Sequence, residues 1–67
     1  DAQIMVTDGC INVNASNAIV TIYNINGQVV ASANIANNGT ISTEGLNGVH
    51  IIKVCTNNNT LVKKIIL

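Results

Sequence analysis

Residues 18–35, with the sequence AIVTIYNINGQVVASANI, have the pattern of two β-strands joined by a tight turn, and the rest of the predicted sheet is built around them. Side chains alternate between the two faces of a strand, so residues at every second position share a face. On this spacing, one face of the first arm carries Ala18, Val20 and Ile22. The face of the second arm that we predict to point inward carries Val29, Ala31, Ala33 and Ile35. The polar residues between them, such as Ser32 and Asn34, indicate a sheet with one face in solvent.

The turn between the arms, NING at residues 24–27, allows two interpretations. A type I turn would start at Asn24 and end in a bulge at Gly27 with positive φ, because asparagine favours the first position and glycine has no Cβ to clash. A two-residue turn on Asn26-Gly27 is the alternative. The two differ in register, and a shift by one residue would exchange the faces of a whole arm.

The composition indicates one small all-β domain over residues 1–67. A chain of this length buries only ~60% of the surface that its unfolded form exposes. With no Phe, no Trp and one Tyr, its core must consist of Ile, Val, Leu and Ala, and the β-branched residues among these favour strands. The chain has twelve asparagines and no proline, and most of the asparagines fall in predicted turns, where this residue tolerates a left-handed backbone.

The charge balance makes two classes of partner unexpected. Three basic and three acidic side chains give a net charge of zero, so the chain lacks the basic surface that binds nucleic acid or an anionic membrane. No apolar run approaches the ~20 residues needed to span a bilayer, and we expect no direct membrane insertion. The sequence starts at Asp1 without an initiator methionine or a signal peptide, and we expect it to be part of a longer chain.

Five further segments predict short strands around this hairpin. They lie at Ile4 and Val6, at Ile11 and Val13 beyond an Asp8-Gly9 hairpin signal, and at residues 40–43, 49–56 and 60–67. Residues 49–56, VHIIKVCT, have no cleanly polar face, which favours a central strand. Residues 60–67, TLVKKIIL, predict an edge strand whose lysines discourage unwanted pairing. We expect an immunoglobulin-like β-sandwich of about seven short, mostly antiparallel strands, with Leu46 packed into the core from a loop.

Residues with reactive side chains do not form a catalytic or metal-binding pattern. Cys10 and Cys55 are too far apart in sequence for a local metal knuckle, and two readings stay open: a disulfide, if their strands are neighbours, or two free thiols. His50 has no acid or nucleophile at useful spacing, and we expect it to pack against aliphatic side chains in its strand. We therefore predict no enzyme, no metal and no cofactor.

Three motifs follow one another between residues 18 and 67: AIVTIYNINGQVV, then GLNGVHIIKV, then LVKKIIL. Their order and spacing resemble the C-terminal sorting domain of proteins exported by the type IX (Por) secretion system. In that family a strand ends in a Tyr-Asp/Asn turn with glycine, Leu-x-x-Gly-Val-Tyr and an apolar strand follow, and a lysine-bearing strand comes last. The matching positions are Val20, Ile22, Tyr23, Asn24 and Gly27, then Leu46, Gly48, Val49, Ile52 and Val54, then Lys63, Lys64, Ile65 and Ile66.

The resemblance departs from the family at two places. His50 stands where the family has tyrosine, and the first hairpin carries Val6-Thr7-Asp8-Gly9 in place of an Asn-Pro segment.

The resemblance implies a non-enzymatic C-terminal label that directs an upstream passenger domain through the periplasm and across the outer membrane to the cell surface or the extracellular space. The implied partners are the outer-membrane translocon and a sortase-like peptidase. Because an edge strand can be read by strand addition, our hypothesis for the recognition surface is Lys63, Lys64, Ile65, Ile66 and Leu67. As structural positions the resemblance implies Tyr23, Asn24, Gly27, Leu46, Gly48 and Val49.

Two other functions compete with sorting. An immunoglobulin-like adhesion module would bind protein or glycan at the surface of its parent protein. Glycan binding is disfavoured because sugar-binding faces stack aromatic rings on the pyranose, and Tyr23 is the only ring of that kind. A purely structural spacer would leave the location of the parent protein unchanged when deleted.

Overall fold

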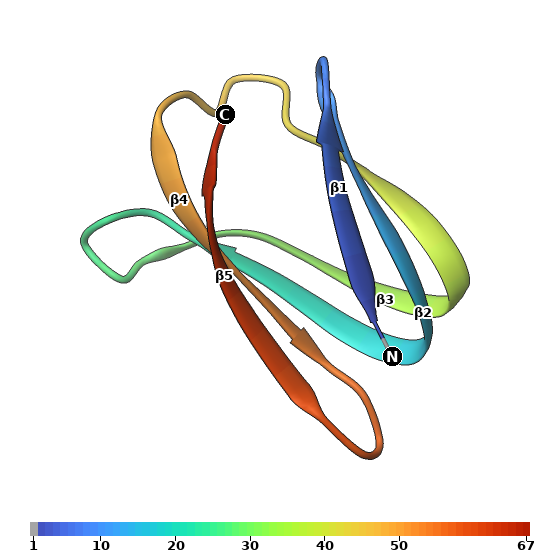
Figure 1. Ribbon diagram of the computed structural model, residues 1–67. Helices are drawn as coiled ribbons and strands as arrows, with labels where there is room; N and C mark the ends of the chain where they lie inside the picture. Colours follow the sequence, from blue (N-terminus) through green and yellow to red (C-terminus); the bar gives the residue numbers. More distant parts are fainter. Residues whose placement is uncertain (1) are drawn as a thin grey trace.

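The computed structural model describes residues 2–67 and shows an all-β domain, in which the described residues form no helix (Figure 1). Its five strands are β1 (Gln3–Thr7), β2 (Cys10–Tyr23), β3 (Val29–Ser42), β4 (Val49–Cys55) and β5 (Thr60–Ile66). All pairings are antiparallel and belong to one curled sheet with the order β1-β2-β4-β5, while β3 pairs with the other side of β2. The second strand therefore pairs with three others.

The expected count of seven strands is wrong, because the chain does not reverse at two of the gaps between the strands expected from the sequence. Residues 15–17 lie inside β2 and residues 36–39 lie inside β3, and the two segments face each other across one long hairpin, with Ser16 opposite Asn37. The register shifts between Val13 and Ser16, and Asn17 and Asn38 have φ values of 51° and 47°. Asparagine tolerates this left-handed backbone, so the polar segments bend the hairpin instead of ending its strands.

The bend also changes which side chains of β2 face the core. Before it the buried side chains are those of Ile11, Val13 and Ala15, and after it those of Ala18, Val20 and Ile22. Buried residues are two positions apart within each half, but Ala15 and Ala18 are three positions apart across the bulge. This step is expected where an extra residue changes the direction of the side chains. Both halves of β2 consequently contribute to a single core. The expected division into two sheets of a sandwich is not seen in the hydrogen-bonding pattern, which joins all five strands.

The core is aliphatic, as the composition predicts. It is completed from β3, β4 and β5 by Ile35, Ile52, Val54 and Ile65. The inward set predicted for residues 29–35 is confirmed at Ile35, which is buried, and at the half-buried Ala31 and Ala33. Val29 is the exception: it is exposed, because the register shifts between Ile22 and Tyr23 where the turn joins the strands.

The turn at residues 24–27 takes the first of the two predicted forms. The Gly27 N–H donates to the Asn24 carbonyl at 3.0 Å, and of the two residues of the rival turn only Gly27 has a positive φ, whereas a type I′ turn needs positive φ at both. The Asn24 side-chain oxygen also accepts hydrogen bonds from the N–H groups of Asn26 and Gln28, at 2.9 and 3.0 Å. The asparagine therefore fixes the turn from its first position.

Candidate functional site

The last strand lies at an edge of the sheet, as predicted. β5 pairs only with β4, and β4 lies between β2 and β5, which confirms that residues 49–55 form a central strand. The other strands with one unpaired side are β1 and β3. An edge strand leaves a row of unpaired backbone N–H and C=O groups that can template another strand.

The hydrogen bonds at the end of β5 show which of its backbone groups are free. Gly48 and Leu67 exchange two bonds, Gly48 N–H to Leu67 O at 3.0 Å and Leu67 N–H to Gly48 O at 2.9 Å. Hydrogen-bonded and non-hydrogen-bonded pairs alternate along an antiparallel ladder, and the register continues as Val49↔Ile66 and His50↔Ile65. The residues whose N–H and C=O point away from β4 are therefore Val62, Lys64 and Ile66.

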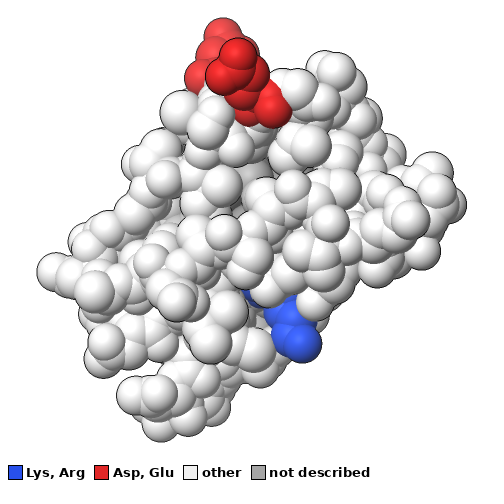
Figure 2. Space-filling view, turned by 180° about the vertical axis from the view of Figure 1, so that it is seen from behind, with Lys and Arg blue, Asp and Glu red and all other residues white. Residues whose placement is uncertain are grey.

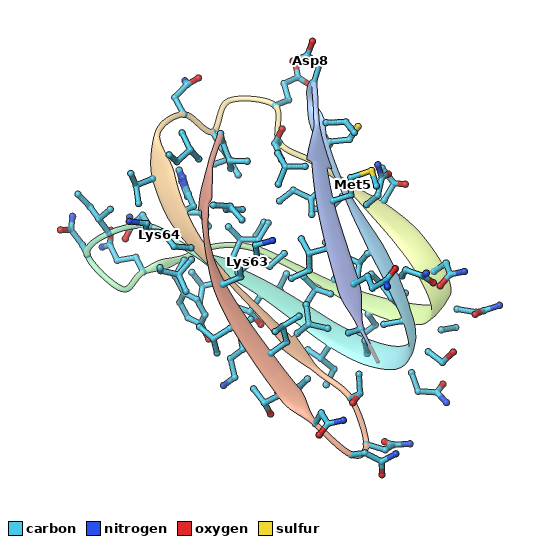
Figure 3. The ribbon with its side chains drawn as sticks, in the orientation of Figure 1. Met5, Asp8, Lys63 and Lys64 are labelled. Atoms are coloured by element: carbon cyan, nitrogen blue, oxygen red, sulfur yellow. The ribbon has the colours of Figure 1, made fainter. Side chains whose placement is uncertain are left out.

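The two lysines of β5 lie on opposite faces of the strand. Lys63 is opposite the fully buried Ile52, so it shares the inner face with Leu61 and Ile65. Lys64 is opposite Ile51 and shares the outer face with Val62 and Ile66, both of which are exposed. Figure 3 shows the same arrangement, with Lys63 directed toward β1 and Lys64 away from it.

The sheet brings together the three motifs that the sequence analysis singled out. Tyr23 at the end of β2 is opposite Ile51 of β4, and Val49 at the start of β4 is opposite Ile66 of β5. Gly48 has a φ of 83° and anchors Leu67 through both of its backbone groups. The structural positions of the motifs thus surround the β4–β5 hairpin, while Asn24 and Gly27 shape the turn that follows β2.

Two other motif positions lie close to this hairpin. Leu46 is half-buried, but it is not one of the partly buried hydrophobic residues that pack on the core in the described part of the chain, so the expected role as a core plug is not seen. His50 is buried, and its Nδ1 lies 3.1 Å from the Gly48 carbonyl oxygen, which can only accept a hydrogen bond. The ring therefore braces the same backbone carbonyl that holds Leu67, on the face that it shares with Ile52 and Val54.

The cysteines do not meet. β2 and β4 are neighbours, but Cys55 is opposite Ile19, nine positions along β2 from Cys10. Both thiols are free, and the Cys55 sulfur lies 3.5 Å from the Thr60 hydroxyl. The structure therefore favours the second of the two readings of the sequence, two unpaired and partly buried thiols.

Charged side chains are few, and the acidic ones lie apart from the basic side chain seen on the same face in Figure 2. The acidic residues of the described chain, Asp8 and Glu44, both lie in turns, and the acidic atoms cluster at one end of the face shown in Figure 2, far from the basic side chain visible there. Within residues 2–67 no three metal-ligating side chains come together, and no helix is long and apolar enough to cross a membrane.

A groove of ≈ 750 Å³ lies beside the inner face of β5. Its lining includes Leu61 and Lys63 from β5, Ile4 and Met5 from β1, and Val13 from β2. Sequence reasoning did not find this groove, because it depends on β1 and β4 pairing with the same side of β2 at different places along its length. It also did not assign Lys63 to the inner face. The even spacing of Leu61, Lys63 and Ile65 was a usable signal, but Val62 and Ile66 gave the opposite face an equally apolar pattern.

Fold and site together define a small all-β domain whose final strand offers a free backbone edge. Residues 5–67 match the family described as "Secretion system C-terminal sorting domain", and the chain belongs to that family. The membership confirms the resemblance and indicates a C-terminal sorting signal for type IX secretion, in a secreted protein destined for the cell surface or the extracellular space. Domains of this family are not known as enzymes. A comparison with curated proteins found no match.

Proposed function

We propose that this domain directs an upstream passenger across the outer membrane, and that the secretion machinery reads it by adding a strand to the free edge of β5. The observation that carries the proposal is the row of outward-facing backbone groups at Val62, Lys64 and Ile66, deduced from the double hydrogen bond between Gly48 and Leu67. In strand addition the backbone supplies affinity and alternate side chains supply specificity. Transit through the periplasm, and contact with the translocon and a sortase-like peptidase, belong to the same proposal.

The curled sheet also suits a label that must fold without help from its passenger. Both halves of the bent β2–β3 hairpin contribute side chains to one core, so each half covers one side of that core. In this sense we propose that the domain works as a compact immunoglobulin-like sandwich, although one continuous ribbon supplies both of its layers.

The export test uses a reporter protein with a signal peptide, joined to residues 1–67 and produced in a host with type IX secretion. Without the domain the reporter stays in the periplasm, and with it we expect the reporter at the cell surface or in the medium. A folded fusion that stays in the periplasm would contradict the sorting function.

A single proline substitution in β5 then separates the effect on recognition from the effect on folding. Lys64→Pro removes an N–H that points away from β4, and proline is tolerated at such edge positions. We expect the variant to fold and to lose export, while Lys64→Ala, which removes the charge and keeps the N–H, loses much less. Equal export of the proline and alanine variants would rule out reading through the backbone edge.

A protein-binding module is the second candidate, and it rests on a different surface. The outer face of the sheet exposes Ile19 on β2 and both Val62 and Ile66 on β5, and exposed apolar residues that share one face mark interaction sites. Substituting Ile19 with threonine separates the candidates. Binding of a partner through the outer face would weaken, whereas export through the β5 edge would not change.

A further inference from the structure

From the faces of β5, and resting on the proposed strand addition, we infer that the strand which the secretion machinery adds carries an acidic side chain opposite Lys63 and apolar side chains opposite Leu61 and Ile65. The partner is an extended segment of a separate protein. Its inward-facing residues are apolar, acidic and apolar in turn, and the residues between them face outward. Its inner side chains face the groove that Leu61 and Lys63 of β5 line together with residues of β1, β2 and β3.

The backbone of β5 sets the register of this strand. Since Val62, Lys64 and Ile66 direct their N–H and C=O groups outward, they form the hydrogen-bonded pairs with an added antiparallel strand. Lys63 then falls in a non-hydrogen-bonded pair, where the Cα atoms approach to ~4.5 Å and side chains are closest. Its partner residue on the added strand is therefore the position at which a charge has the largest effect.

The inner face of β5 determines which side chains the added strand needs. Leu61 is half-buried and packs on the core, Ile65 is buried, and the exposed Lys63 lies between them on the same face. The groove that Leu61 and Lys63 line has ≈ 750 Å³, within the ~300–1,000 Å³ range of ligand sites in proteins. Apolar side chains fit beside Leu61 and Ile65, whereas a carboxylate fits Lys63, because opposite charges facing each other across strands are stabilising.

A second copy of the chain is a poorer occupant. Antiparallel pairing of two β5 strands centred on Lys63 or on Lys64 places each lysine opposite its own copy, which is destabilising. The acidic residues of the described chain, Asp8 and Glu44, lie in turns, so neither stands on a strand that could face Lys63. The lysines thus disfavour self-pairing in these two registers, whereas a strand of opposite charge fits Lys63.

The test measures binding of blocked nine-residue peptides to the 67-residue chain. The peptides have valine at positions 1, 3, 7 and 9, threonine at the even positions, and glutamate, glutamine or lysine at position 5. We expect the glutamate peptide to bind about 2- to 5-fold more tightly than the glutamine peptide, and the lysine peptide to bind most weakly. The preference should shrink in 0.5 M salt, as exposed charge pairs do.

Two variants assign the preference to one lysine. Lys63→Glu should reverse the order, so that the lysine peptide binds best, a gain that loss of folding cannot produce. Lys53→Glu makes the same charge change on the opposite face of β4, where Lys53 faces Val62, and should leave the order unchanged. Amide hydrogen exchange should slow at Val62, Lys64 and Ile66 on binding.

Several results would overturn the inference. They are equal binding of the glutamate and glutamine peptides, no binding of any peptide, a preference that survives Lys63→Glu, protection of β1 or β3 amides in place of β5 amides, or a dimer of the free chain that breaks up when Lys63 or Lys64 is changed. Failure of this kind is distinct from failure of the sorting function. A reporter fusion that reaches the surface while the peptides show no charge preference would refute only the acidic partner strand.

Discussion

The two neighbouring isoleucines of β5 provide a matched test of the structure, because the same residue type lies on opposite faces of one strand. Ile65 is 4% exposed and belongs to the core, whereas Ile66 is 71% exposed on the outer face. We expect Ile65→Ala to lower the free energy of unfolding by about 2–3 kcal/mol, the lower part of the range for such core truncations, because an edge strand is covered on one side only. Ile66→Ala should cost less than about 1 kcal/mol.

The size of the domain makes the larger effect easy to detect. At ~0.05–0.15 kcal/mol per residue, the total stability is on the order of 3–10 kcal/mol. Urea unfolding followed by circular dichroism measures both variants against the parent chain, and with a slope of ~1 kcal/mol per molar urea the midpoint for Ile65→Ala should fall by about 2–3 M. The midpoint for Ile66→Ala should stay within about 1 M of the parent value.

The reasoning fails if the two variants shift the midpoint equally or if Ile66→Ala shifts it more. A larger shift for Ile66→Ala would mean that β5 is displaced by one residue against β4, because a slip of one position moves every side chain to the opposite face. Such a slip would also exchange Lys63 and Lys64. Ile65→Val serves as the graded control and should cost about 0.5–1.5 kcal/mol.

Three further measurements test other parts of the structure. Asn24→Ala removes the acceptor of two backbone N–H groups in the turn and should cost about 1 kcal/mol in thermal unfolding, while Asn24→Asp keeps the acceptor and should cost less; equal losses would contradict the turn geometry. Asn38→Gly should be neutral or stabilising at its φ of 47°, whereas Asn38→Val should cost more than about 1 kcal/mol, and the reverse order would show that the bend is absent. A thiol reagent applied to unfolded, unreduced protein should count two thiols, from Cys10 and Cys55, and a count of zero would establish a disulfide instead.

Sequence reasoning predicted local features of the fold well because those features depend on neighbouring residues. The alternation of Ala18, Val20 and Ile22, the Asp8-Gly9 hairpin and the turn that begins at Asn24 each follow from side-chain spacing or from local turn chemistry. The edge position of residues 60–66 and the central position of residues 49–55 also follow from composition.

The strand count was wrong for a reason that lies outside local sequence. A polar segment reverses the chain when the flanking strands pair with each other, but it bends a strand when a second polar segment faces it. Here Ser16 is opposite Asn37, a relation between residues 21 positions apart. Gly39 belongs to the same bend: a Cβ there would lie 3.2 Å from the Ile35 side chain, so the position favours glycine. Only the register of the long hairpin shows this.

The candidate site was predicted as a strand but not as a surface. The sequence placed Lys63 and Lys64 at an edge, whereas assigning them to opposite faces needed the pairing of β5 with β4. Predicting the groove would have required the whole sheet topology, since β1 and β5 come from opposite ends of the sequence and do not pair directly. A pattern with apolar residues on both faces, such as residues 61–67, cannot distinguish inner from outer by itself.

Because β2 pairs with β1, β3 and β4, these four strands form one hydrogen-bonded framework, and β5 pairs with that framework through β4 alone. Apart from Ile65 and its packing neighbours, substitutions in the last strand leave the main-chain pairing of β2 untouched. Binding preference can therefore diverge between relatives while their architecture is retained. Under the proposed strand addition, exchanging this one strand between related domains should transfer the binding preference from one domain to the other.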